Sequence, residues 1–222
     1  MTGLWWIIHK DLTSEIRARR AWPTMLLLGA IVGLVFSLHM DLLPHQKQRL
    51  VGGLLWLAIF FGGVTAIDRS FASEHEDGCW DGLRLFPVSP VTVYWAKLLV
   101  NALAVAVLQC LLFPLFFVLS DLPLTAHPGQ LLLIAALGNL GIVAVGTFVS
   151  ALGASLGRGG NLLVLLVLPL VIPVLLAAAE ATRLLIESRA DEAWWRWIQL
   201  LGASVIVFTT AGTLLFEYAV EE

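Results

Sequence analysis

The stretch LLVNALAVAVLQCLLFPLFFVLS, which runs from Leu98 to Ser120, decides the fold class because it contains no charged side chain. A helix needs about 20 apolar residues to cross the roughly 30 Å hydrocarbon core of a bilayer. Within that core every backbone N–H and C=O must be paired inside the protein, and a helix achieves this within one segment. We therefore predict that this stretch is a transmembrane helix.

Five further stretches have comparable length and apolarity, so the chain is predicted to cross the membrane six times. The other predicted spans are Trp22 to Met40, Val51 to Ile67, Leu131 to Leu156, Asn161 to Ala179 and Ile198 to Phe216. Hydrophobic residues make up 59% and charged residues 13% of the chain, against about 45–50% and about 25% in soluble domains. The predicted fold class is an all-α polytopic membrane protein with one membrane domain over residues 1–222.

A helix lying on the membrane surface is predicted for residues 1–21. Its apolar residues repeat at helical spacing, and charged residues occupy the other faces, as is typical of interfacial helices. The apolar set is Leu4, Ile7, Ile8, Leu12 and Ile16. A tail without fixed structure is the alternative interpretation.

The distribution of Lys and Arg predicts the orientation in the membrane. Of the 13 basic residues, eight lie on the side of the N-terminus and five lie in the loops of the opposite side. The set of eight is Lys10, Arg17, Arg19, Arg20, Arg69, Arg84, Lys97 and Arg158. Basic residues of short loops resist translocation, so both termini are predicted to be cytoplasmic.

The longest predicted cytoplasmic connection, residues 68–97, reads DRSFASEHEDGCWDGLRLFPVSPVTVYWAK. Before its final lysine, five acidic residues stand against two arginines. Trp80, Leu83 and Phe86 follow at three-residue steps, which predicts an apolar stripe on a short helix that Pro87 would end. Two interpretations stay open: this helix docks into a groove of a soluble protein, or it lies on the membrane surface.

Motifs for independent chemistry are absent from the sequence. It contains no GxxxxGK[ST] phosphate-binding loop, no HExxH and no CxxC. We therefore predict no catalytic, metal or cofactor site in this chain, and a partner must supply any ATPase. A net charge of −3 without a basic cluster argues against nucleic acid as a partner.

Several polar residues interrupt the apolar spans. Glu180, Arg183 and Glu187 are spaced to pair along one helical face, and we expect a structural role for them at the rim of the fifth span. Asn101 and Gln109 in the third span are expected to form hydrogen bonds between helices.

Small residues and prolines give two packing predictions. One face of the fourth span carries small residues that allow a close helix approach, namely Gly146, Ser150, Gly153, Ala154 and Gly157. Pro169 and Pro173 in the fifth span each remove a backbone donor and are predicted to kink it.

Two passages resemble the CcmB family, the haem exporter protein B subunit of bacterial cytochrome c maturation. The first is the 68–97 connection, through Asp68, Arg69, Phe71, Asp77, Gly78, Leu83, Leu85, Pro87, Pro90, Ala96 and Lys97. The second is RGGNLLVLLVLPLVIP, from Arg158, Gly159 and Gly160 to Pro173. The second is the more particular to this family, and the resemblance covers essentially the whole chain.

The resemblance implies a permease-like subunit of an ATP-binding-cassette complex in the bacterial inner membrane. The implied partners are a dimeric ATPase, CcmA, which binds ATP and Mg²⁺, the membrane proteins CcmC and CcmD, a second copy of this chain, and the haem chaperone CcmE. ATPase coupling is predicted to act through Asp68, Arg69, Phe71, Glu74, Glu76, Asp77, Gly78, Trp80, Asp81, Leu83, Leu85, Phe86, Pro87 and Lys97. The alternatives are a permease for an unrelated drug, lipid or glycan exporter, and a membrane-embedded enzyme, for which no acid, base or nucleophile cluster is found.

Trp194, Trp195 and Trp197 are predicted to lie at the outer mouth of the sixth span. Stacking of a flat ligand such as haem is one interpretation. Anchoring at the membrane interface is favoured, because tryptophan is enriched there. Other tryptophans, including Trp56, are also predicted to lie near span ends or polar segments.

Overall fold

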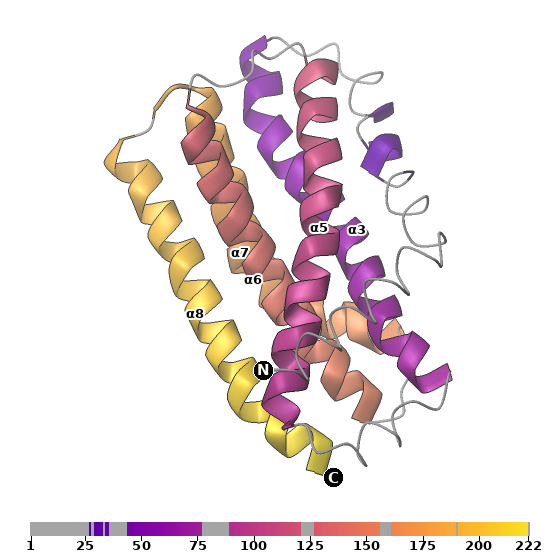
Figure 1. Ribbon diagram of the computed structural model, residues 1–222. Helices are drawn as coiled ribbons and strands as arrows, with labels where there is room; N and C mark the ends of the chain where they lie inside the picture. The colour runs from indigo at the N-terminus through magenta and orange to yellow at the C-terminus, as the bar shows by residue number, and fades with distance from the viewer. Residues whose placement is uncertain are drawn as a thin grey trace.

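The computed structural model describes residues 27, 29–32, 34–35, 44–76, 89–120, 127–155, 161–189 and 191–221. The regular structure of these residues is entirely α-helical, and Figure 1 shows its long helices side by side in one bundle. These helices are α3 (Pro44–Glu76), α5 (Pro90–Leu119), α6 (Pro128–Ser155), α7 (Asn161–Ile186) and α8 (Glu192–Glu221).

Consecutive helices run in alternating directions, so the bundle has two distinct ends (Figure 1). We call one the motif end; it holds Glu76, Pro90, Ser155 and Asn161. The opposite end is called the α7–α8 end, and it holds Leu119, Pro128, Ile186 and Glu192. Helix α3 packs against α5, α6 and α7, whereas α8 packs mainly against α6 and α7.

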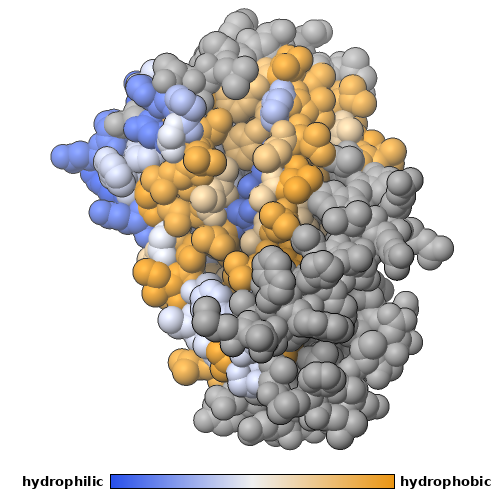
Figure 2. Space-filling model, viewed as in Figure 1, coloured by the Kyte–Doolittle hydropathy of each residue, from blue (hydrophilic) through white to orange (hydrophobic). Residues whose placement is uncertain are grey.

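The described helices include five that are long and apolar enough to cross a membrane. The candidate spans are Arg49–Ile67, Val91–Leu119, Pro128–Val149, Val167–Ile186 and Glu192–Leu214. Figure 2 shows that apolar residues cover much of the visible outer surface along the helices, while hydrophilic residues gather at one end. Because such a surface needs lipid rather than water around it, the chain is a multi-pass membrane protein.

The second to sixth predicted spans each correspond to one of these helices, but the helices extend beyond the apolar stretches. The first predicted span and the predicted surface helix lie largely outside the described residues. Within the first span, the described positions 27, 29–32 and 34–35 are helical.

The predicted connection over 68–97 is shorter than expected. Residues 68–76 continue α3, because no helix breaker follows the apolar stretch, and residues 90–97 form the first turns of α5. At the start of α5, Ser89 caps the helix: its Oγ accepts a hydrogen bond from the Thr92 backbone N–H at 3.4 Å, and Pro90 follows. Sequence hydropathy therefore marks the lipid-crossing part of a helix, whereas capping marks its end.

Close helix contacts occur where glycine leaves room. A Cβ at Gly146 of α6 would lie 2.6 Å from Ile67 Cδ1 of α3, which confirms that this position of the predicted small-residue face is used for packing. The side chains of the other residues of that face lie outside the described set.

Candidate functional site

Both passages that carry the family resemblance lie at the motif end of the bundle. The 68–97 passage contributes the last residues of α3 and the first residues of α5, and the passage ending at Pro173 contributes the first half of α7. The described parts of the two passages therefore share one end of the bundle, although they are far apart in sequence. Residues 77–88, which include Trp80 and Phe86, and residues 156–160 lie outside the described residues.

Lys97 lies in a helix and not on an exposed connection. It belongs to the second turn of α5, and only 2% of the residue is exposed. Tyr94, one turn earlier, is also fully buried, and a Cβ at Gly212 of α8 would collide with its hydroxyl. The predicted role of Lys97 in ATPase coupling stays a prediction.

The two prolines of the second passage lie inside α7, which continues through both of them to Ile186. Pro169 faces the outside of the bundle and Pro173 is half-buried. The core-facing side of this half of α7 is formed by Val167, Val171 and Val174. The predicted kink stays a prediction.

A row of hydrogen bonds joins α5 and α6 inside the membrane-spanning region. Asn101 Nδ2 donates to Thr147 Oγ1 at 3.1 Å, and Gln109 Nε2 donates to the carbonyl oxygen of Ala135 at 3.3 Å. Asn139 Nδ2 donates to the carbonyl oxygen of Ala102 at 3.0 Å. The interhelical hydrogen bonds predicted for Asn101 and Gln109 are therefore confirmed, and we call this row the α5–α6 polar seam.

Trp56 is a core residue, so interfacial anchoring is wrong for it. Its ring is fully buried, and Nε1 donates to Thr182 Oγ1 of α7 at 2.9 Å. The ring also meets Phe113 of α5 edge-on, with centroids 6.1 Å apart, and lies where a Cβ at Gly138 of α6 would be. Composition does not distinguish a buried tryptophan from an interfacial one, because burial depends on how the helix is rotated about its axis.

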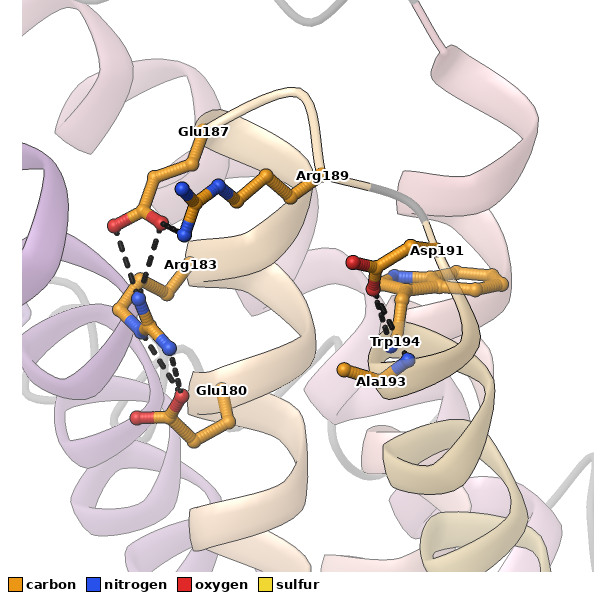
Figure 3. Close-up of polar contacts among 7 residues, drawn as sticks. All are labelled: Glu180, Arg183, Glu187, Arg189, Asp191, Ala193 and Trp194. Atoms are coloured by element: carbon orange, nitrogen blue, oxygen red, sulfur yellow. Dashed lines mark hydrogen bonds and ion pairs between the residues drawn. The ribbon is translucent and has the colours of Figure 1, made fainter.

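A charged cluster occupies the α7–α8 end, as Figure 3 shows. Arg183 donates to Glu180 Oε2 from Nη2 at 2.7 Å and from Nε at 2.9 Å, and to both Glu187 carboxylate oxygens from Nη1 at 3.0 and 3.1 Å. Arg189 Nη1 lies 4.0 Å from Glu187 Oε2. The predicted pairing along one face of α7 is confirmed, and we call these four residues the α7 charge cluster.

The turn after α7 is closed by backbone hydrogen bonds. Arg189 N–H donates to the Leu184 carbonyl at 2.8 Å, and Ser188 N–H donates to the Leu185 carbonyl at 3.1 Å. Ser188 has φ of 56°, and this combination forms a Schellman motif with serine at the left-handed position. Asp191 caps the next helix, α8: its Oδ1 accepts hydrogen bonds from the backbone N–H groups of Ala193 and Trp194 (Figure 3).

The tryptophans at the start of α8 have different surroundings. Trp194 is 1% exposed and packs in the core, so interfacial anchoring is wrong for this residue. Trp195 is 54% exposed, lies perpendicular to Trp194 at 5.0 Å between ring centroids, and has the exposure that an anchor requires. Trp197 is half-buried. Across the described part of the chain, no three His, Cys, Asp or Glu side chains are grouped to hold a metal ion.

Sequence reasoning missed a close approach between the backbones of two helices. A Cβ at Gly52 of α3 would lie 2.7 Å from the carbonyl oxygen of Ala179 and 3.5 Å from the backbone nitrogen of Arg183, both on α7. The adjacent Gly53 has open space on its Cβ side. The only signal in the sequence is the Gly-Gly pair, which does not show which glycine contacts α7 and which has open space.

Comparison with known proteins gives one consistent result. The family model described as CcmB protein matches residues 2–222. A protein named Heme exporter protein B from Paracoccus denitrificans is 36% identical over 177 residues, which are 80% of this chain and 81% of that protein. Its namesake from Rhodobacter capsulatus is 33% identical over 177 residues, with coverage of 80% and 81%. The Pseudomonas aeruginosa protein of that name is 32% identical over 184 residues, with coverage of 83% and 82%. The resemblance found in the sequence is thus confirmed, and the chain belongs to the CcmB family.

Proposed function

We propose that this chain is the transmembrane subunit of an ATP-binding-cassette complex in the haem-export system of cytochrome c maturation. The observation that carries the proposal is the family match over residues 2–222, together with relatives named Heme exporter protein B that align with about four fifths of the chain. The multi-pass helical bundle suits a transport subunit. The same function was expected from the two passages now found on α3, α5 and α7.

In this proposal the chain is not itself an enzyme, and ATP is hydrolysed by a CcmA-type dimer. The chain lacks a phosphate-binding loop, which supports assigning ATP and Mg²⁺ to the partner. The motif end faces the cytoplasm of a bacterium, with the membrane being the inner membrane. The ATPase contacts residues 68–88, an acidic stretch that carries the apolar stripe of Trp80, Leu83 and Phe86.

Closure of the ATPase then shifts two copies of the bundle against each other, and the complex with CcmC and CcmD releases the haem-loaded chaperone CcmE. A ligand-driven shift of this kind requires different binding free energies for the two arrangements. ATP bound at the CcmA dimer supplies that difference.

A deletion strain tests the biological function. We expect haem-loaded chaperone to accumulate and mature c-type cytochromes to be absent, because release of the chaperone fails. The measurement is covalent haem staining of the periplasmic chaperone and of the cytochromes, with complementation by the intact gene as the control. Normal levels of mature cytochromes would contradict the proposal.

Substitutions in the predicted coupling segment test the partner contact. Purified complexes with Trp80→Ala or Gly78→Pro should retain less ATPase than the wild type, as measured by co-purification. Trp195→Ala makes the same change at the opposite end of the bundle, where the residue is exposed, and should leave ATPase association intact. Full association of both coupling-segment variants would remove this segment from the interface.

A further inference from the structure

Helix α3 connects the two ends of the bundle without interruption. It runs from Pro44 at the α7–α8 end to Glu76 at the motif end. The 20 residues between Trp56 and Glu76 correspond to about 30 Å along the helix axis. A displacement applied at Glu76 therefore reaches the level of Trp56 through one continuous helix.

At that level, Trp56 contacts three other helices at once. It donates a hydrogen bond to Thr182 on α7, meets Phe113 on α5 edge-on and lies over Gly138 on α6. A fully buried ring enclosed in this way cannot move independently of its neighbours, because the interior is close-packed. Movement of α3 at Trp56 therefore displaces the surrounding helices.

The contact with α7 has a defined geometry. Thr182 Oγ1 donates to the carbonyl oxygen of Ala178 at 2.7 Å, so its hydroxyl is oriented to accept the Trp56 hydrogen bond. One turn before Trp56, Gly52 places the α3 backbone against Ala179 and Arg183 of α7. Arg183 is the centre of the α7 charge cluster, so this contact is adjacent to the α7–α8 end.

We infer that Trp56 and Thr182 are positioning residues, which transmit displacement of α3 to the α7 charge cluster and the α7–α8 turn. This inference rests on the proposed function for the source of the displacement, namely the ATPase at the motif end. The α3–α7 joint itself is defined by contacts within this chain. Coupling between distant sites can be carried by such a continuous chain of packed and hydrogen-bonded groups.

The first test examines the joint in the purified full-length chain in lipid. Cys79 and Cys110 are replaced by serine, and spin labels are attached at Leu57→Cys on α3 and Leu176→Cys on α7, two positions that face outward. We expect one narrow distance distribution for the parent. Thr182→Val and Trp56→Phe should broaden or shift it, because the hydrogen bond is lost, and Thr182→Ser should restore it because the hydroxyl is kept.

The matched control is Thr210→Val on α8, where the exposed threonine hydroxyl donates only to carbonyls of its own helix, those of Ile206 and Val207. It should leave the distribution unchanged. If Thr182→Val gives a distance distribution with the same mean and width as the parent, the inference is overturned. This holds whatever the outcome for the proposed function.

The second test measures haem-loaded chaperone released per ATP hydrolysed in the complete complex. We expect Thr182→Val to lower this ratio by about fivefold or more while the ATPase rate changes by less than about twofold, with recovery in Thr182→Ser. If the rate of chaperone release and the ATPase rate fall in proportion, the ratio is unchanged. That result would indicate a purely structural role and overturn the inference. A wild-type complex without ATP-dependent release of haem-loaded chaperone would instead refute the proposed function, and the spin-label comparison would still decide on the joint.

Discussion

At the scale of single residues, the two adjacent glycines of α3 have opposite surroundings. Gly52 lies against the α7 backbone, whereas Gly53 has no atom within 4 Å of the position of a Cβ. A backbone carbonyl cannot rotate away as a flexible side chain can. The helix pair α3–α7 therefore requires glycine at position 52 and tolerates a larger residue at position 53.

Gly52→Ala should lower the free energy of unfolding by about 1–3 kcal/mol, because the added methyl group forces α3 and α7 apart. Gly53→Ala is the control and should leave stability unchanged or slightly raised, since alanine favours the helix. Thermal unfolding in detergent measures both variants. Equal melting temperatures for the two variants would contradict the close approach.

Ser188 holds a left-handed backbone conformation that glycine adopts without steric cost. Ser188→Gly should therefore leave stability unchanged or raise it by up to about 1 kcal/mol, and Ser188→Val should lower it. Denaturant titrations of the purified chain provide the comparison. If Ser188→Gly lowered the free energy of unfolding more than Ser188→Val, the serine side chain rather than the backbone conformation would hold the turn.

At the scale of elements, helix pairs are joined by few but specific polar contacts. The α5–α6 polar seam is surrounded by apolar side chains, and polar pairs in such surroundings join transmembrane helices. At the α7–α8 end, the α7 charge cluster keeps Glu180 and Glu187 paired with Arg183. These contacts fix how the helices are rotated, which apolar packing alone leaves less specific.

A double-mutant cycle on Asn101→Leu and Thr147→Val should give a coupling free energy of about 0.6 kcal/mol, and no more than about 1.7 kcal/mol. The physical reason is that each single variant removes the same hydrogen bond between α5 and α6. Unfolding in mixed lipid and SDS micelles gives the four free energies. Asn101→Leu paired with Thr210→Val on α8 should be additive, and coupling in that pair would invalidate the interpretation.

Arg183→Gln should destabilise the chain by about 1–3 kcal/mol, because Glu187, which is only 16% exposed, loses its principal cation. Arg196→Gln removes the same charge from a pair in which Arg196 and Glu192 are 76% and 95% exposed and 3.9 Å apart, and should have little effect. Melting temperatures at two salt concentrations measure both changes. A larger loss for Arg196→Gln would refute the ranking.

At the scale of the whole molecule, the alternating helices determine which segments share a side of the membrane. The described parts of the 68–97 and 158–173 passages lie at the motif end, and the α7 charge cluster lies at the other. Any partner that contacts both passages must therefore approach from one side.

Cysteine labelling tests the proposed orientation. In spheroplasts, a membrane-impermeant maleimide should modify Glu192→Cys in a Cys79→Ser, Cys110→Ser background, because residue 192 is 95% exposed at the α7–α8 end. Native Cys79, with Cys110→Ser, should react only after lysis. Reaction of Cys79 in intact spheroplasts would place the motif end outside and contradict the assignment of an ATPase to it.

The sequence alone determined the membrane character, the approximate positions of five described helices and the family. These properties are local, because the bilayer requires each segment to be apolar and internally hydrogen-bonded regardless of its neighbours. For the same reason, the pairing of Arg183 with Glu180 and Glu187, three and four residues away, was predictable from spacing.

Only the tertiary structure decided which residues from different helices meet. Trp56 and Thr182 are 126 positions apart, and their hydrogen bond depends on the rotation and register of α3 and α7. Lys97, expected in a cytoplasmic connection, and Trp194, expected at the membrane interface, are buried for the same reason. Rotation and register follow from the simultaneous packing of side chains from several helices, a property that no single segment of sequence contains.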